Sequence, residues 1–178
     1  MVIRISPLED LAFELMLGGS QHSGVTIHFL NSILADQHKL TDVKILNPFL
    51  GKKSADDKLA VLDILATDEH GRFLNIEMQT SLSTGLAQRL TYSVASVYVG
   101  QVHERHRYAA PRPAISICVL TEALFPASSA LHLDFRLRES SSDRILTDDL
   151  QIHLLWGSTT NAARDVGFCR LQQVLGIS

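Results

Sequence analysis

The sequence predicts an α/β fold in which helices flank a mixed β-sheet. Runs rich in β-branched, leucine and aromatic residues predict strands, at residues 42–46, 61–66, 73–78, 114–120 and 131–138. Apolar residues at helical spacing predict helices, over residues 7–17, 25–34 and 86–104. Because these helices interrupt the series of strands, we expect them to cover the faces of one sheet.

Local signals support the individual elements. Ser6 and Pro7 suit the start of the first helix. The long helix has an apolar stripe, at Leu86, Leu90, Val94, Val97 and Val102. Residues 114–120 follow Pro113 as a continuous apolar run typical of a buried strand, whereas residues 131–138 alternate as in a half-exposed strand. Residues 152–156 predict a last short strand.

Length and composition agree with a single domain. The chain has 178 residues, of which 46% are hydrophobic and 20% are charged, and this is enough for a substantial core. The formal net charge of −3 gives no overall positive field of the kind that drives tight non-specific binding of nucleic acid. Affinity for DNA would have to come from a local group of basic residues.

Cysteine usage and hydropathy predict a cytoplasmic protein. Cys118 lies in an apolar predicted strand, and two cysteines, Cys118 and Cys169, do not make a disulfide framework. We find neither a secretory leader pattern nor a run of about 18 apolar residues. The motifs of a phosphate loop, a tetrahedral zinc site and a serine-hydrolase elbow are also missing.

A predicted β-hairpin carries two carboxylates among its hydrophobic residues. Its strands are residues 61–66 and 73–78, and Asp63 and Glu77 would lie where an unpaired charge is costly. Side chains alternate along a strand, so Glu77 and Gln79 point the same way, about 6.5 to 7 Å apart along the backbone, and Asp63 can face them. A divalent cation is one natural partner. Ion pairs with neighbours, Lys58 or Arg72, are the alternative.

Short motifs around this hairpin resemble those of a known nuclease family. Asp63 followed fourteen residues later by E-x-Q resembles the PD-(D/E)XK nuclease superfamily, with Gln79 in the place of the usual lysine. The ordered motifs look like the Rpn family of recombination-promoting nucleases and transposases: Asn47-Pro48, Asp57-Lys58, Leu62-Asp63 and Asn75-Ile76-Glu77-Met78-Gln79. The likeness runs from about Asp10 to Trp156 and implies a restriction-endonuclease-like core.

The resemblance implies a metal-dependent mechanism. Asp63 and Glu77 would hold Mg²⁺, or Mn²⁺ in its place, against the scissile phosphate, and the metal would activate water. Gln79 stands where relatives often place a lysine that orients or polarises that water. A neutral amide can only position the water through hydrogen bonds, so the metal must contribute more of the activation.

The first predicted helix offers a third acidic residue. Related nucleases often place an acidic residue of this helix near the metal, and here that residue would be Asp10. The alternative for Asp10 is a favourable interaction with the helix N-terminus. The family pattern continues with Phe and then Lys, but this chain has Phe13 and then Glu14, so the charge there is reversed.

Four basic residues are candidates for contacts with DNA phosphates. Lys58 belongs to a family motif, Arg89 lies on the helix after the E-x-Q strand, and Arg105 and Arg107 come at the end of that helix with Tyr108 nearby. The alternative for Arg89 is a surface salt bridge. The alternative for the other two arginines is a solvated helix end whose basic residues complement the helix dipole.

The function implied by the resemblance is that of an endonuclease that hydrolyses phosphodiester bonds of double-stranded DNA during recombination or transposition. The rival hypothesis is a catalytically inactive, truncated nuclease remnant that only binds DNA or a protein, because fold alone does not separate the two. The sequence does not determine the oligomeric state, and it is compatible with a homodimer.

We expect a nuclease-like domain over residues 1–156 and a divergent, disordered tail over residues 157–178. The resemblance is lost beyond Trp156, where relatives continue into a longer chain, and the first tail residues are polar.

Deleting residues 157–178 should therefore change the melting temperature little, which differential scanning calorimetry of the full and shortened chains would measure. A large fall in melting temperature would instead identify the tail as part of the folded structure.

Overall fold

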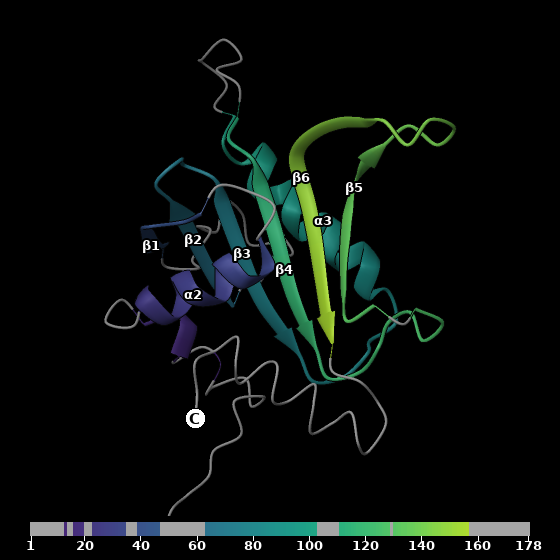
Figure 1. Ribbon diagram of the computed structural model, residues 1–178, viewed down its shortest axis with the longest axis horizontal. Coiled ribbons are helices and arrows are strands. Elements are labelled where there is room, and N and C mark those ends of the chain that lie inside the picture. Colours follow the sequence, from purple (N-terminus) through teal and green to yellow (C-terminus); the bar gives the residue numbers. More distant parts are fainter. Residues whose placement is uncertain are drawn as a thin grey trace, which may run out of the picture.

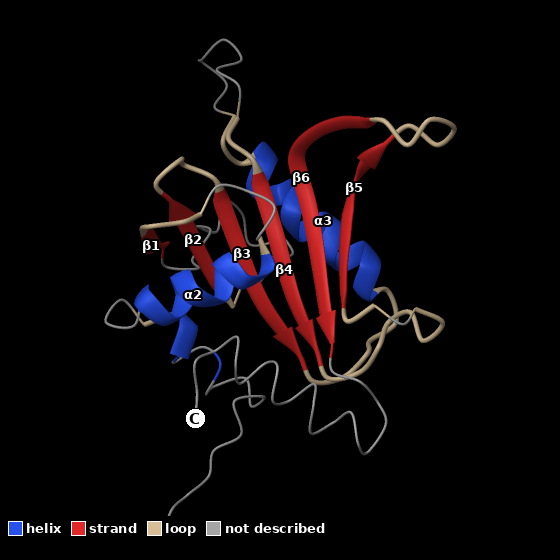
Figure 2. Ribbon diagram, viewed as in Figure 1, coloured by secondary structure: helices blue, strands red, loops and turns tan. Residues whose placement is uncertain are grey.

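The structure is a computed structural model that describes residues 13, 16–19, 23–34, 39–46, 63–102, 111–128 and 130–156. These residues form a mixed sheet in the order β1-β2-β3-β4-β6-β5. The strands are β1 (Val43–Leu46), β2 (Ile64–Asp68), β3 (Phe73–Gln79), β4 (Ala114–Leu120), β5 (His132–Arg138) and β6 (Ile145–Trp156). Helix α2 (Ser23–Ile33) lies on one face and helix α3 (Leu86–Val99) on the other (Figures 1 and 2). The predicted α/β fold is confirmed.

Antiparallel and parallel pairing meet at β3. Strands β1, β2 and β3 are antiparallel neighbours, whereas β3 pairs in parallel with β4, and β4 pairs in parallel with β6. Strand β5 returns antiparallel to β6 and ends the described sheet. Because parallel neighbours need a crossover connection, the chain passes through α3 between β3 and β4.

The β2–β3 turn is held by the carboxylate of Asp68. Its Oδ1 accepts hydrogen bonds from the backbone N–H groups of His70 and Arg72, at 3.0 and 2.8 Å, and its Oδ2 pairs with the Arg72 guanidinium. Gly71 completes the turn with a φ of 77°, in the left-handed region that glycine adopts without strain. The turn predicted over residues 68–71 is confirmed, and it sets the register of the two strands that carry the candidate site.

The sheet has a hydrophobic core on each face. On the α2 side, Phe29 and Leu30 pack with alternate residues of the central strands, such as Ile76 and Ile117. On the α3 side, residues of the helix form two clusters with the strands: Leu86 and Leu90 with Cys118, Leu120, Leu154 and Trp156, and Val94 and Val97 with Leu65 and Ala114. All seven residues of β4 are buried, as the continuous apolar run predicts, because both faces of this strand are covered.

Some boundaries differ from the prediction. The long helix ends at Val99, short of the predicted residue 104, and Gly100 donates its backbone N–H to the Ser96 carbonyl at 2.9 Å. Glycine weakens helix continuation, so the predicted stripe position Val102 lies beyond the helix and is exposed. Strand β6 begins seven residues earlier than predicted, at Ile145, because it pairs with β5 as a hairpin before it joins β4.

The structure describes only part of the first predicted helix, residues 7–17. Phe13, Met16 and Leu17 of the predicted first helix are helical, and Phe13 and Leu17 are buried in the core on the α2 side. Thr26 of α2 donates its hydroxyl to the Leu17 carbonyl at 2.7 Å. Among the helices that the structure describes, none has the length and apolar character needed to cross a membrane.

Two glycine substitutions test the conformational argument for the turn. A Cβ on Gly71 would meet only ordinary contacts with Arg112, the nearest at 3.6 Å, so the cost of Gly71→Ala comes from its φ of 77°. We expect it to lower the free energy of unfolding by about 1 to 2 kcal/mol. Gly24→Ala in α2 meets nothing within 4 Å and should raise that free energy by about 0.5 kcal/mol.

Urea unfolding of both variants checks this prediction, with the unchanged chain as the reference. Equal shifts of the two variants would show that backbone conformation at Gly71 does not control the turn.

Candidate active site

Asp63 and Glu77 lie on the face of the sheet that α3 covers. In β3, Leu74, Ile76 and Met78 belong to the core on the α2 side. The alternating residues Asn75, Glu77 and Gln79 therefore belong to the opposite face. The register pairs Ile64 with Ile76, and one step further along the same register brings Asp63 opposite Glu77.

Asp63 is tied directly to β3. Its Oδ2 accepts a hydrogen bond from the backbone N–H of Met78 at 2.9 Å. The carboxylate thus takes the place of a strand carbonyl at the point where β2 begins. This bond orients the Asp63 side chain beside the end of β3, next to Glu77.

Glu77 is a buried acid, with 4% of its surface exposed. Burial raises the pKa of Glu77, and the charge of Asp63 raises it further. The charge of Arg89 and hydrogen bonds from Asn75 and Ser116 act in the opposite direction, but the net shift of this pKa is upward. Ionised Glu77 is therefore poorly compensated in the metal-free site.

Asn75 and Ser116 hold the Glu77 carboxylate from the side. The Asn75 amide Nδ2 donates to Glu77 Oε1 at 2.9 Å and lies 3.5 Å from the Ser116 hydroxyl oxygen. The parallel register pairs Asn75 with Ser116 and Glu77 with Cys118. Asn75 Oδ1 is a buried oxygen with no hydrogen-bond partner, so the site keeps a free acceptor beside Glu77.

This donor set fits a hard divalent cation. Two carboxylates supply oxygen ligands, and Mg²⁺ characteristically keeps several waters and uses only one or two carboxylates. Within the described ranges no group of three or more His, Cys, Asp and Glu side chains could hold a metal ion. A cation between Asp63 and Glu77 would therefore leave much of its coordination sphere to water and substrate.

Gln79 and Arg89 border the two acids. Gln79 is the last residue of β3 and is half-buried, and its carbonyl accepts the backbone N–H of Thr121 at 3.2 Å. Arg89 lies in the first turns of α3 with an exposed side chain, and its charge lowers the pKa of both Glu77 and Cys118. Arg89 is thus a basic group within electrostatic reach of the acids and open to a ligand.

The remaining predicted site residues fall outside the description. Asp10, Lys58, Arg105 and Arg107 are not among the described residues. Of the two alternative ion-pair partners weighed for the acids, Arg72 pairs with Asp68 in the turn, and Lys58 is not described.

Sequence reasoning missed three neighbours of Glu77. Asn75 stood in the quoted motif without a role, and its spacing of two from Glu77 was the signal that could have given it one. Ser116 and Cys118 had no local signal, because only the parallel pairing of β3 with β4 brings them to the site. Burial raises the pKa of the Cys118 thiol, so it stays protonated and packs as an apolar group.

Fold and site together define a class of protein. The mixed sheet brings an aspartate that directly precedes β2 beside the acid of the E-x-Q segment on β3. This is the arrangement expected of a PD-(D/E)XK nuclease core. A family model identifies the family: the chain belongs to the PD-(D/E)XK nuclease family transposases, whose model matches residues 7–162. Comparisons with curated proteins and with solved structures gave no match. A nuclease or transposase-like function follows from the family.

The raised pKa of Glu77 predicts how stability depends on pH. A folded-state pKa above its ordinary value of 4.5 means that stability is highest when Glu77 is protonated and falls as pH rises from there through the folded pKa. In EDTA at pH 8, Glu77→Gln should therefore raise the melting temperature by a few degrees. At pH 4 this gain should largely disappear.

Asp63→Asn is the companion variant. It removes the same repulsion and retains an oxygen that can accept the Met78 N–H, so the metal-free melting temperature should stay equal or rise. Thermal melts of both variants and of the unchanged chain, in EDTA at pH 4 and pH 8, measure these differences in melting temperature. A clear loss of stability in both variants at pH 8 would mean that cationic groups of the fold already compensate the two acids.

Proposed function

We propose that this protein is a metal-dependent DNA endonuclease that hydrolyses phosphodiester bonds. The observation that carries the proposal is the convergence of Asp63 and Glu77 on one sheet face, together with the poorly compensated charge of buried Glu77. A fold that places two acids together at an energetic cost retains them for a ligand that relieves the cost, and a divalent cation does so. The family membership supports nuclease chemistry at this site.

Asp63 and Glu77 would hold Mg²⁺, with Mn²⁺ as the alternative. When bound, the cation supplies Lewis acidity and lowers the pKa of a coordinated water. Asn75 keeps one oxygen of Glu77 fixed through its 2.9 Å hydrogen bond, so the carboxylate is oriented before any ligand arrives. This preorganisation limits the side-chain entropy lost on binding.

Gln79 has the role of positioning the attacking water. Its amide both donates and accepts hydrogen bonds but carries no charge. Positive charge near the phosphate would come instead from Arg89, whose exposed guanidinium already acts on Glu77. Leu86 and Leu90 pack in one cluster with Cys118 and Leu120, so the start of α3 is anchored over the end of β4 and carries Arg89 with it.

The second candidate is a DNA- or protein-binding module without catalytic activity. The observation that favours it is Gln79 itself, because a site with a neutral residue at this position has lost one source of positive charge. The endonuclease proposal has three further parts. They are a link to recombination or transposition, double-stranded DNA as the substrate, and contacts with DNA by Lys58, Arg105 and Arg107.

A plasmid cleavage assay separates the two candidates. Purified protein should nick or linearise plasmid DNA with Mg²⁺ or Mn²⁺, and EDTA should abolish this. Asp63→Asn and Glu77→Gln should each reduce the rate at least about 100-fold, because each removes a metal ligand. Gln79→Lys should equal or exceed the unchanged chain, because an ammonium group restores positive charge near the attacking water.

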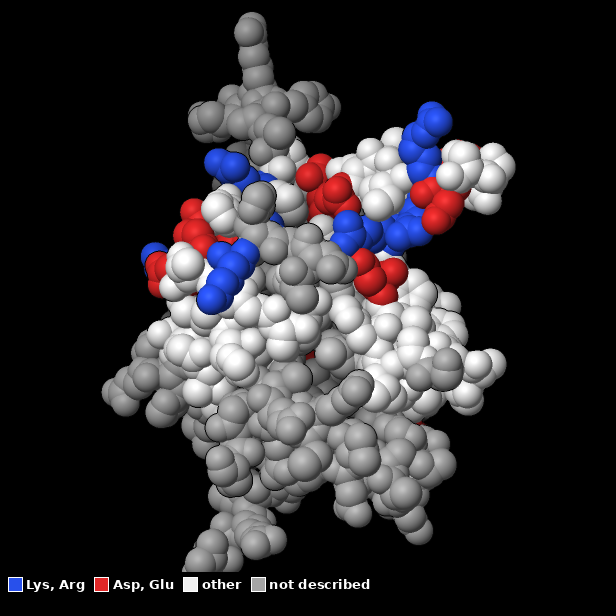
Figure 3. Space-filling view, in the orientation of Figure 1, with Lys and Arg blue, Asp and Glu red and all other residues white. Residues whose placement is uncertain are grey.

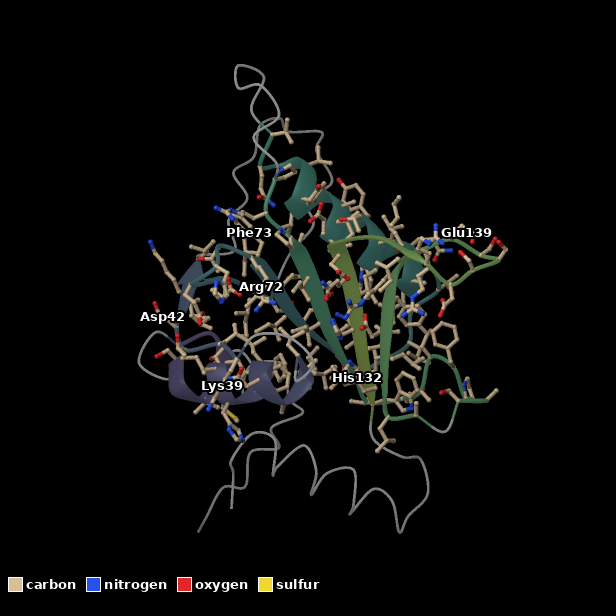
Figure 4. The ribbon with its side chains drawn as sticks, turned by 45° about the horizontal axis from the view of Figure 1, so that its top comes forward. Lys39, Asp42, Arg72, Phe73, His132 and Glu139 are labelled. Carbon is tan, nitrogen blue, oxygen red and sulfur yellow. The ribbon has the colours of Figure 1, made fainter. Side chains whose placement is uncertain are left out.

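Matched controls lie on the β5–β6 hairpin. Asp148→Asn and Glu139→Gln make the same chemical changes at exposed positions. The hairpin lies beyond β4 in the sheet order, and Figure 4 shows Glu139 well apart from Phe73 of β3. Both should cleave like the unchanged chain. An intact plasmid with both the unchanged chain and Gln79→Lys, in either metal, would overturn the endonuclease proposal in favour of the binding module.

A further inference from the structure

The structure points to a homodimer interface along β5. We infer that the outer edge of β5 pairs antiparallel with β5 of a second copy, with Phe135 opposite its own counterpart, so that two sheets become one. Strand β5 is last in the sheet order, and among the described strands it pairs only with β6. The direction of its backbone groups, its charge pattern and its exposed apolar residues all favour this pairing.

The backbone of β5 presents alternate residues to the free edge. The Leu131 carbonyl accepts the Trp156 N–H at 3.1 Å, so Leu131 and, by alternation, Leu133 and Phe135 direct their polar groups toward β6. The N–H and C=O groups of Asp134 and Arg136 then point outward. Two copies related by a two-fold axis at Phe135 would form hydrogen-bonded pairs between Asp134 of one copy and Arg136 of the other.

The side chains of β5 are self-complementary in this register. With Phe135 at the axis, Asp134 faces Arg136 and Leu133 faces Leu137. Each charged residue thus faces one of opposite charge, and each leucine faces another leucine. A register centred on Asp134 would set aspartate against aspartate, and one centred on Arg136 would set arginine against arginine. Like charges directly opposite are destabilising, so the charge pattern selects the Phe135 register.

Both charged residues can accept a further partner. Within one copy, Arg136 pairs with Asp134 at 2.7 Å and with Asp148 at 2.6 Å. A carboxylate has about four lone-pair sites and a guanidinium has five N–H donors, so the pairing adds contacts without breaking those present. Basic and acidic side chains lie next to one another on the upper part of this hairpin (Figure 3).

Apolar surface continues the edge on the α3 side. Phe135 and Leu137 are 39% and 45% exposed, and Phe125 from the preceding loop is 41% exposed. The rings of Phe125 and Phe135 lie 5.7 Å apart between centroids. In the dimer, the Phe135 pair is of the closer, non-hydrogen-bonded kind, so four phenyl rings would meet at the axis and leave water together.

Sedimentation velocity over a range of concentrations tests the proposal. The full chain should show a concentration-dependent dimer. Phe135→Lys should weaken association at least tenfold by placing two ammonium groups at the axis. Leu146→Lys is the control at a more exposed apolar residue, 80% accessible and off the edge, and it should leave the dimer intact.

Disulfide trapping tests the register. In a Cys169→Ser background with Cys118 buried, Phe135→Cys should form a covalent dimer under mild oxidation, because the paired residues lie at a distance that a disulfide spans. Asp134→Cys should not, because it faces Arg136. A monomer at all concentrations, or a dimer that Phe135→Lys leaves unchanged, would overturn the proposal. Equal trapping of both cysteines would overturn the register.

Discussion

The pairing of β3 on both sides is the constraint on which the candidate site depends. Strand β3 is antiparallel to β2 and parallel to β4, so the direction of every side chain is determined by its place in the alternation. Leu74, Ile76 and Met78 fill the core on the α2 side, and this burial holds Glu77 on the other face. A slip by one residue would drive the acid into that core and expose the apolar set, which makes the register strongly specified.

The same constraint has an electrostatic consequence. Because β3 is covered by α3, Glu77 is buried, and because β2 pairs with it, Asp63 lies opposite. Burial and the neighbouring charge then raise the pKa of Glu77. The cores on both faces of β4 and the hydrogen-bonded turn at Asp68 stabilise the fold and offset the electrostatic cost at Glu77. This distribution is common in proteins whose sites bind charged ligands.

The β5–β6 hairpin differs in character from the rest of the sheet. Its polar side chains form a connected row that ends at His153, which is 2% exposed and stacks on His132 with 5.1 Å between ring centroids. Burial lowers the pKa of His153 to about 4, so it stays neutral at physiological pH. The row joins β5 to β6 through side chains as well as backbone.

The sequence by itself determined the local elements, because their signals are local. Strands β1 to β5, helix α2, the turn at Asp68 to Gly71 and the shared face of Glu77 and Gln79 follow from hydrophobic period and turn chemistry within a few residues. The end of α3 at Val99 was not predicted, because the apolar stripe continued past Gly100 and outweighed the glycine. Tertiary structure decided the rest. Ser116 and Cys118 reach Glu77 only through a parallel pairing across about forty residues, and such pairing leaves no periodic trace in the chain. The pKa of Glu77 likewise follows from burial and from the distance to Asp63 and Arg89, which exist only once the sheet and α3 have packed.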